Sequence, residues 1–380
     1  MNKIISKINA RLIRYLRRDK LIVLGKGVSI RKKKVLISYL EPEVYLSDVN
    51  PNHSNVNDYV VIVNAFLELG FEVHLAYCCS LNKSELLGYD VIFGFGEAFY
   101  RACNSNGKAL KILYCTESSP NFSYEKECER VSEFNKMYSK NEKLIRTHKY
   151  FTNEMLEISD IIIIIGNESV LDTFSYVNKP KYSGIYPSAL INQKYNKYQK
   201  KPGYKNSFLW FGSTGVVHKG LHLAIHAINQ RPDFKLYVAG ANKKERKKMP
   251  ESTNTIYLGR IDVQSDEFIN LINNCSAFIL PSCSEAGSTA TTTCLAHGLL
   301  PITTKEVGVA LPIGFEHLSS DKFQHILERM DEVSTMNDLE YRHKHDILVD
   351  YARSNFSIGK FENEFKELIL KVMDDHKTWF

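Results

Sequence analysis

The sequence lacks any apolar run long enough to cross a membrane. A spanning helix needs about 20 apolar residues, and the longest run here, Ile161–Ile165, has the length of a buried strand. The N-terminus also lacks the single apolar block of a secretory signal, because its apolar residues are interleaved with Lys and Arg. We therefore expect a chain that does not span a bilayer.

Paired cysteines and metal-ligand spacings are missing as well. The eight cysteines are scattered, with no C-x-x-C pair and no His/Cys cluster of zinc spacing. This usage is typical of reduced thiols buried in a cytoplasmic protein. We expect a cytoplasmic location and no bound metal.

Acidic residues are almost absent from the beginning of the chain. Residues 1–34 hold twelve Lys and Arg against one acid, Asp19, which is a net charge of +11. The whole chain is at +6, so the remainder carries −5. The basic character therefore belongs to an N-terminal arm, residues 1–30, and does not indicate a nucleic-acid partner.

Residues 3–18 fit an amphipathic helix with an apolar face and a cationic face. The apolar side chains on one arc are Ile4, Ile5, Ile8, Leu12 and Leu16. One interpretation is an interfacial helix on an anionic membrane, which would place the protein peripherally on the cytoplasmic face of the inner membrane. The other is a helix that docks on its own domain. The absence of acids before Asp19 favours the membrane.

Residues 31–200 predict a first α/β domain. Short apolar runs separated by helix-length segments are typical of a parallel sheet covered by helices on both faces. The predicted strands are 34–39, 72–77, 89–94, 111–115 and 161–165. Segment 192–206 has no apolar period and contains Pro202-Gly203, so we interpret it as a linker.

Polar residues near the carboxyl ends of these strands are candidates for an acceptor site, where ligands of such sheets gather. They are His53, Asn57 and Glu117. Residues 125–130 predict the start of a charged helix, on which Glu127 and Arg130 have the spacing of a surface pair.

The second half of the chain contains two loops suited to a phosphorylated sugar. Strand 208–211 leads into the turn Gly212-Ser213-Thr214-Gly215, and Lys219 opens the following helix, a favourable place for a phosphate. Strand 277–282 leads into Glu285 and a loop of small residues that opens another helix. A carboxylate there can accept hydrogen bonds from sugar hydroxyls while loop amides hold a phosphate.

This order of motifs, over about residues 205–305, resembles glycosyltransferase family 4, the group 1 glycosyl transferases. The resemblance includes the string Ala296-His297-Gly298-Leu299-Leu300-Pro301. It implies the GT-B fold, an α/β architecture of two Rossmann-like domains with parallel sheets facing a cleft. The donor domain would span 205–355, and a C-terminal helix within 356–380 would cross back to the first domain.

The resemblance also implies roles by position. Lys219, Gly212 and Ser213 would bind the donor diphosphate, with Ser288 and Thr289 in the loop whose amides face the phosphates. Glu285 would contact the transferred sugar and be the catalytic residue. Two positions depart from the family: Ser213 replaces an Arg, and Thr293 replaces the Glu that binds the ribose. Thr293 would contact the nucleoside ribose through its hydroxyl, without charge assistance. A serine cannot supply the bidentate phosphate contact of an arginine.

The expected function is transfer of a sugar from a nucleotide-sugar donor to a glycan or lipid-linked acceptor, with retention and without metal or cofactor. The implied setting is the biosynthesis of a bacterial surface polysaccharide or lipopolysaccharide. Ser213 and Thr293 leave open a degenerate GT-B protein that binds a nucleotide, a glycan or a partner without turnover. A nucleotide-sugar epimerase is a further alternative.

Overall fold

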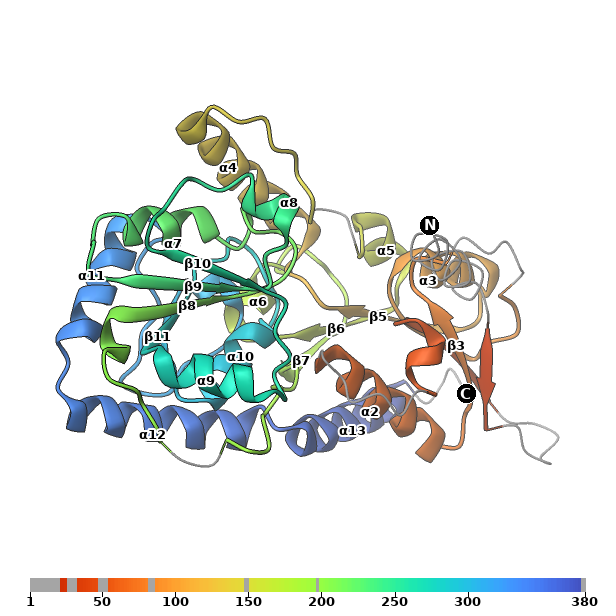
Figure 1. Ribbon diagram of the computed structural model, residues 1–380. Coiled ribbons are helices and arrows are strands. Elements are labelled where there is room, and N and C mark those ends of the chain that lie inside the picture. The colour runs from red at the N-terminus through yellow and green to blue at the C-terminus, as the bar shows by residue number, and fades with distance from the viewer. Residues whose placement is uncertain are drawn as a thin grey trace, which may run out of the picture.

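A computed structural model describes residues 21–25, 33–46, 54–80, 86–146, 150–195 and 198–376. The predicted arm at 3–18 and the candidate His53 lie outside these residues. The described chain forms two α/β halves that lie side by side, each built around a largely parallel sheet (Figure 1). None of the described helices is long and apolar enough to cross a membrane.

The first sheet has seven described strands in the order β1-β3-β2-β4-β5-β6-β7. They are β1 (Ile22–Leu24), β2 (Lys34–Tyr39), β3 (Glu72–Tyr77), β4 (Val91–Gly94), β5 (Leu110–Cys115), β6 (Ile161–Ile165) and β7 (Lys181–Ile185). All pair in parallel except β1, which lies antiparallel to β3 at one edge. The central strands are buried on both faces, which explains their continuous apolar sequences.

Helices connect these strands. They are η1 (Pro42–Val44), α2 (Ser54–Glu68), α3 (Gly96–Ser105), α4 (Pro120–Tyr138), α5 (Asn153–Ile158) and α6 (Glu168–Asp172). Helix α4 begins five residues before the predicted charged segment, because Ser119 caps it by accepting the Phe122 amide and Pro120 occupies its first turn.

The second sheet has five described strands in the order β10-β9-β8-β11-β12, all parallel. The strands are β8 (Ser207–Phe211), β9 (Lys235–Ala239), β10 (Thr255–Gly259), β11 (Ala277–Leu280) and β12 (Leu300–Thr303). The helices are η2 (Tyr204–Asn206), α7 (Leu221–Ile228), α8 (Lys243–Arg246), α9 (Asp266–Asn274), α10 (Thr289–Ala296), η3 (Lys305–Val307), α11 (Phe323–Thr335), α12 (Asp338–Asn355) and α13 (Ile358–Asp375).

This architecture confirms the predicted α/β fold class with two parallel sheets. Strands β1 and β7 were not expected from the sequence. Strand β7 is an edge strand whose middle residues are exposed, so its sequence has no apolar run that would reveal it.

The C-terminal helix crosses back to the first sheet, as predicted. In Figure 1, α12 runs beneath the second sheet and α13 continues beneath the first, beside α2. Five α13 side chains belong to the core of the first sheet: Phe361, Phe365, Leu368, Ile369 and Val372.

Helix α4 leaves its own sheet and packs on the other one (Figure 1). Val131 and Phe134 belong to the core of the second sheet, and Phe134 lies edge-on against His222 of α7. The predicted surface pair of Glu127 and Arg130 is therefore wrong. Both side chains are buried, and neither pairs with the other because each faces a different set of loop groups.

The segment 192–206, interpreted as a linker, is docked on the second sheet in its described part. The Asn192 side-chain amide donates to the Val263 carbonyl at 2.7 Å, and the Tyr195 hydroxyl donates to the His297 carbonyl at 2.9 Å. Lys200 is half-buried; desolvation of its ammonium group lowers its pKa to about 7, and it donates to two carbonyls at the end of α9. Specific hydrogen bonds therefore fix this segment on the second sheet, although its sequence has no apolar periodicity.

The buried Asp58 of α2 gives a pH-dependent prediction. Its carboxylate accepts the Ser188 amide at 3.2 Å, yet burial raises its pKa to about 7. An acid whose pKa is higher in the folded protein binds more protons when folded, so stability falls as pH rises from about 4 to 7. Asn cannot ionise but can still accept the amide. We expect Asp58→Asn to be more stable than wild type by about 2 kcal/mol at pH 8 and by much less at pH 5.

Urea unfolding at both pH values measures this difference. Asp90→Asn is the matched control, since Asp90 is an exposed acid that also accepts a backbone amide, that of Lys34. A stability gain from Asp58→Asn that is equal at pH 5 and pH 8 would contradict the prediction.

Candidate active site

Lys219 is placed by a glycine turn between β8 and α7. The turn brings the Lys219 carbonyl to Trp210, whose indole donates to it at 3.2 Å. Gly220 then starts α7 with a φ of +67°, and a Cβ there would lie 2.6 Å from the Pro281 carbonyl oxygen. Only glycine fits this close approach of two loops. The turn therefore directs the Lys219 side chain toward the loop that follows β11.

That loop carries Glu285, which forms an ion pair with Lys219. Ser282 also donates to the Glu285 carboxylate, at 3.3 Å. Burial by itself would raise the pKa of Glu285, but Lys219 and Arg146 outweigh it and lower the pKa to about 2. Glu285 is thus an anion at every pH where the protein would work.

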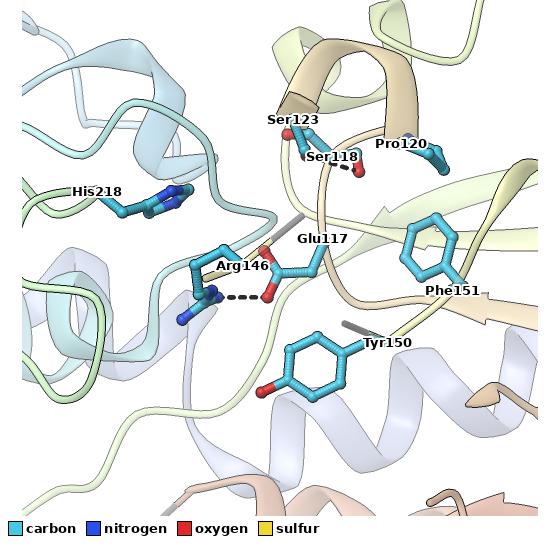
Figure 2. A pocket seen from close by; sticks show the side chains of 8 residues that line it. All are labelled: Glu117, Ser118, Pro120, Ser123, Arg146, Tyr150, Phe151 and His218. Atoms are coloured by element: carbon cyan, nitrogen blue, oxygen red, sulfur yellow. Dashed lines mark hydrogen bonds and ion pairs between the residues drawn. The ribbon is translucent and has the colours of Figure 1, made fainter. Parts of the chain in front are cut away.

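Glu117 and Arg146 complete a cluster of four charged side chains. Glu117 follows β5, and Arg146 lies in the loop after α4; the two form an ion pair (Figure 2). Arg146 Nη2 also lies 3.7 Å from Glu285 Oε2. Burial raises the pKa of Glu117, and the Arg146 charge opposes this effect. Burial would lower the pKa of Arg146, but the two carboxylates outweigh it and raise that pKa.

His218 borders the cluster as a neutral side chain. Burial, together with the Arg146 and Lys219 charges, lowers its pKa to about 4 although Glu285 acts in the opposite direction. Its ring contacts the Ser284 carbonyl and lies 3.4 Å from the Cys283 sulfur. His218 therefore holds the Glu285 loop and does not supply the charge that the sequence lacks at position 213.

The structure brings together three of the predicted residues: Lys219, Glu285 and Glu117. Gly212 and the exposed Ser213 lie on the turn before Lys219, and no side chain at these positions offers a cation. Asn57 lies half-buried in the first turn of α2. Arg146 was missed, because nothing in its charged neighbourhood distinguishes it in the sequence.

Two of the residues predicted for the phosphate loop and the ribose, Ser288 and Thr293, make hydrogen bonds within the protein. The Ser288 amide donates to the Val307 carbonyl at 2.8 Å, and the Ser288 hydroxyl caps α10 by accepting the Thr291 amide. Thr289 follows as the first residue of α10. The buried Thr293 hydroxyl accepts the Leu190 amide at 3.1 Å.

Direct contacts close the two halves of the molecule around the cluster. Ser118 donates to the Glu285 carbonyl at 2.8 Å, and Ser123 lies 2.9 Å from the Ser284 hydroxyl. Arg130 donates to the Pro281 carbonyl at 3.0 Å and pairs with Asp321 at 2.7 Å. The structure is thus a closed form in which Glu285 lies at the junction.

Two cavities lie at this junction. One is about 20 Å³, and its lining residues include Glu117, Arg146 and His218 (Figure 2). The other is about 240 Å³ and is lined from both halves, by groups that include Asp172, Glu285 and Lys305. Small-molecule sites usually measure about 300–1,000 Å³, so the closed form has room for only part of a large ligand.

A comparison with known protein families gives a match in the second half of the chain. Residues 193–313, which include Lys219 and Glu285, match the family described as "Glycosyl transferases group 1". A search of curated proteins gave no match.

Several solved structures share the fold. Sucrose-phosphate synthase from Thermosynechococcus elongatus has a TM-score of 0.61 at 12% identity, covering 91% of this chain and 100% of that one. Anabaena HepE, solved with UDP and glucose, has a TM-score of 0.56 at 12% identity and covers 90% of this chain and 100% of that one. WaaG, a glycosyltransferase involved in lipopolysaccharide biosynthesis, has a TM-score of 0.55 at 14% identity, with 88% and 99% covered.

The family match covers most of the second sheet, and the structural similarity covers both sheets. Residues 193–313 are thus similar to the group 1 glycosyl transferases, and the chain as a whole has the GT-B fold of the solved glycosyltransferase structures that it resembles.

Proposed function

We propose that the protein transfers a sugar from a nucleoside diphosphate sugar to a glycan or lipid-linked acceptor. The observation that carries the proposal is the ion pair of Lys219 and Glu285 at the junction of the two halves, inside the segment that matches the family. A cation beside an anion at the carboxyl ends of parallel strands suits a donor with a phosphate at one end and sugar hydroxyls at the other.

In this proposal the second half binds the donor. Lys219 and the start of α7 offset the charge of the leaving diphosphate as its bond to the anomeric carbon breaks. Glu285 accepts hydrogen bonds from hydroxyls of the transferred sugar. The acceptor oxygen takes the place of the diphosphate oxygen at the same carbon and gives its proton to the departing diphosphate, with retention as the family resemblance implies. We propose that the charge of Lys219 and the partial positive charge at the start of α7 make a metal ion unnecessary.

The closed geometry fits a cycle of opening and closing. The cavity beside Glu285 is too small for a whole nucleotide sugar, so the donor enters while the halves are apart. Closure through Ser118, Ser123 and Arg130 then excludes water, which favours transfer over hydrolysis.

A donor panel tests this function. Purified protein is offered UDP-, GDP-, ADP- and dTDP-sugars, with and without EDTA, and thermal shift and sugar release are followed. We expect one donor to raise the melting temperature and to release sugar slowly, with EDTA causing no change. Lys219→Ala should weaken binding of that donor at least about 10-fold, the usual effect of losing one charge-assisted hydrogen bond.

The matched control is Lys235→Ala, since Lys235 is an exposed lysine at the start of β9 and away from the cluster. If no nucleotide sugar at millimolar concentration shifts the melting temperature, the proposal fails.

A non-catalytic binding protein is the second candidate, and two observations favour it. Ser213 is exposed and uncharged on the turn before Lys219, and the Thr293 hydroxyl is engaged by the Leu190 amide. A protein of this kind would bind the donor or a glycan without releasing sugar. The same panel separates the two functions, because it measures binding and turnover independently.

The proposal extends to the biological setting. Among the fold relatives, HepE was solved with UDP, and WaaG is involved in lipopolysaccharide biosynthesis. We therefore propose UDP as the first nucleotide to test and a bacterial surface polysaccharide or lipopolysaccharide as the product. A peripheral position on the cytoplasmic face of the inner membrane, through residues 3–18, remains a hypothesis drawn from the sequence.

A further inference from the structure

We propose that Arg146, which reaches the cleft from the loop between α4 and α5, is a second diphosphate-binding cation that acts with Lys219. The inference rests on the proposed function, since it assigns a further residue to the same donor site. Nothing in the motif pattern of the second half points to this residue. It comes from the other half of the molecule, and its role follows from where its side chain lies.

The Arg146 side chain is nine-tenths buried and incompletely satisfied. It is 11% exposed, its Nη2 pairs with Glu117, and its buried Nε has no hydrogen-bond partner among the residues that the structure describes. A buried guanidinium with an unused donor is costly unless a ligand completes its hydrogen bonds. The Nε–H group of Arg146 is therefore a candidate hydrogen-bond donor to an anion in the cleft.

The stem of Arg146 lies over the turn that leads to Lys219. Gly215 has a φ of +92°, and a Cβ at this position would lie 3.6 Å from Arg146 Cδ and 3.7 Å from Cγ. The guanidinium is also 3.7 Å from Glu285 through Nη2. Arg146 thus lies between the turn at Gly215, which would face the diphosphate, and the Glu285 carboxylate, which would face the sugar. From this position its guanidinium can contact the second phosphate of a donor.

The loop that carries Arg146 is fixed from both halves of the molecule. The buried Glu127 carboxylate accepts the backbone amides of Ile145 at 2.9 Å and Arg146 at 3.0 Å. Further along the loop, Glu142 forms an ion pair with Lys248 of the second half. Arg146 is consequently held in place when the halves are closed, as preorganised binding of a phosphate requires.

The charges in the cluster suit an exchange of partners. Two anions, Glu117 and Glu285, face two cations, Lys219 and Arg146. A guanidinium binds phosphate oxygens with the same planar geometry that it uses for a carboxylate. When the diphosphate arrives, the Arg146 guanidinium binds a phosphate oxygen in place of Glu117 while its backbone amide stays bound to Glu127, so donor binding and domain closure stabilise each other.

The test measures binding of UDP and UMP to the full chain by calorimetry; if the donor panel selects another base, its diphosphate and monophosphate replace them. We expect Arg146→Gln to weaken UDP binding about 10- to 100-fold, as loss of charge-assisted hydrogen bonds does, and UMP binding less than about 3-fold. Arg146→Lys keeps the charge near Glu117 and guards against a folding defect. It should bind UDP with intermediate affinity, because lysine lacks the bidentate fork.

Two double variants separate a ligand contact from a structural role. Ser213 is exposed on the same turn, so Ser213→Arg in the Arg146→Gln background should recover a large part of the lost UDP affinity. If Arg146 only neutralises Glu117, the recovery would instead come from Arg146→Gln combined with Glu117→Gln, and this result would overturn the inference.

The outcomes also distinguish this inference from the function on which it rests. If wild type binds the diphosphate and Lys219→Ala does not, while Arg146→Gln binds it as wild type does, the inference fails and the proposed function stands. If wild type binds no nucleoside diphosphate, the proposed function fails and this inference fails with it.

Discussion

Glu285→Gln is expected to lower the rate of sugar transfer by about 10²- to 10³-fold, the usual effect of removing one group that stabilises a transition state electrostatically. Nucleoside diphosphate binding should be unchanged or tighter. The reason is that the Glu285 carboxylate competes with a phosphate for Lys219 and lies 3.7 Å from Arg146. Glutamine has nearly the same shape but leaves both cations available to the diphosphate.

The charge state of Glu285 makes this prediction specific. With a pKa lowered to about 2, the carboxylate is ionised throughout the neutral range and is not a proton donor there. We therefore expect no acidic limb from Glu285 in the rate above about pH 4. The carboxylate acts by accepting hydrogen bonds and by its charge.

Steady-state kinetics with the donor selected by the panel would measure the effect. Glu267→Gln is the control, since Glu267 is an exposed carboxylate in the first turn of α9, outside the cleft. A Glu285→Gln rate within about threefold of wild type would show that Glu285 does not contact the transferred sugar. Complete absence of transfer by wild type with intact binding would instead favour the non-catalytic candidate.

The sequence predicted the part of the site that is local in the chain. Lys219 and Glu285 each follow a strand with a readable apolar pattern and each precede a helix, so their places at the sheet edge follow from parallel topology. The order of the motifs along the chain added the fold, which the two sheets confirm. These features depend on residues close together in sequence.

The part that was missed depends on contacts between distant segments. A pair spaced like Glu127 and Arg130 lies on one helix face whether that face meets water or another domain, so the sequence could not reveal that α4 crosses to the second sheet. Arg146 is 139 residues before Glu285 in the chain and stands among several other charged residues. Only the folded loop, fixed by Glu127, shows which of those charges enters the cleft.

Phe365→Ala is expected to destabilise the protein by about 3–5 kcal/mol, the usual cost of removing a fully buried aromatic ring from a core. Phe365 is 0% exposed, and its ring centroid lies 5.9 Å from that of Phe93 in β4. It also stacks on Phe361 one turn earlier in α13. The side chain thus joins the last helix of the chain to a central strand of the first sheet.

The effect should spread to both halves, because α13 continues directly from α12, which packs on the second sheet. Weaker packing of α13 on the first sheet removes one of the contacts that fix the two halves relative to each other. Donor turnover should therefore fall along with stability. Urea unfolding by circular dichroism measures the first effect, and Leu370→Ala is the control on the same helix. Leu370 is 53% exposed, so its loss should cost no more than about 0.5 kcal/mol. Equal effects of the two substitutions would show that α13 does not complete the first core in solution.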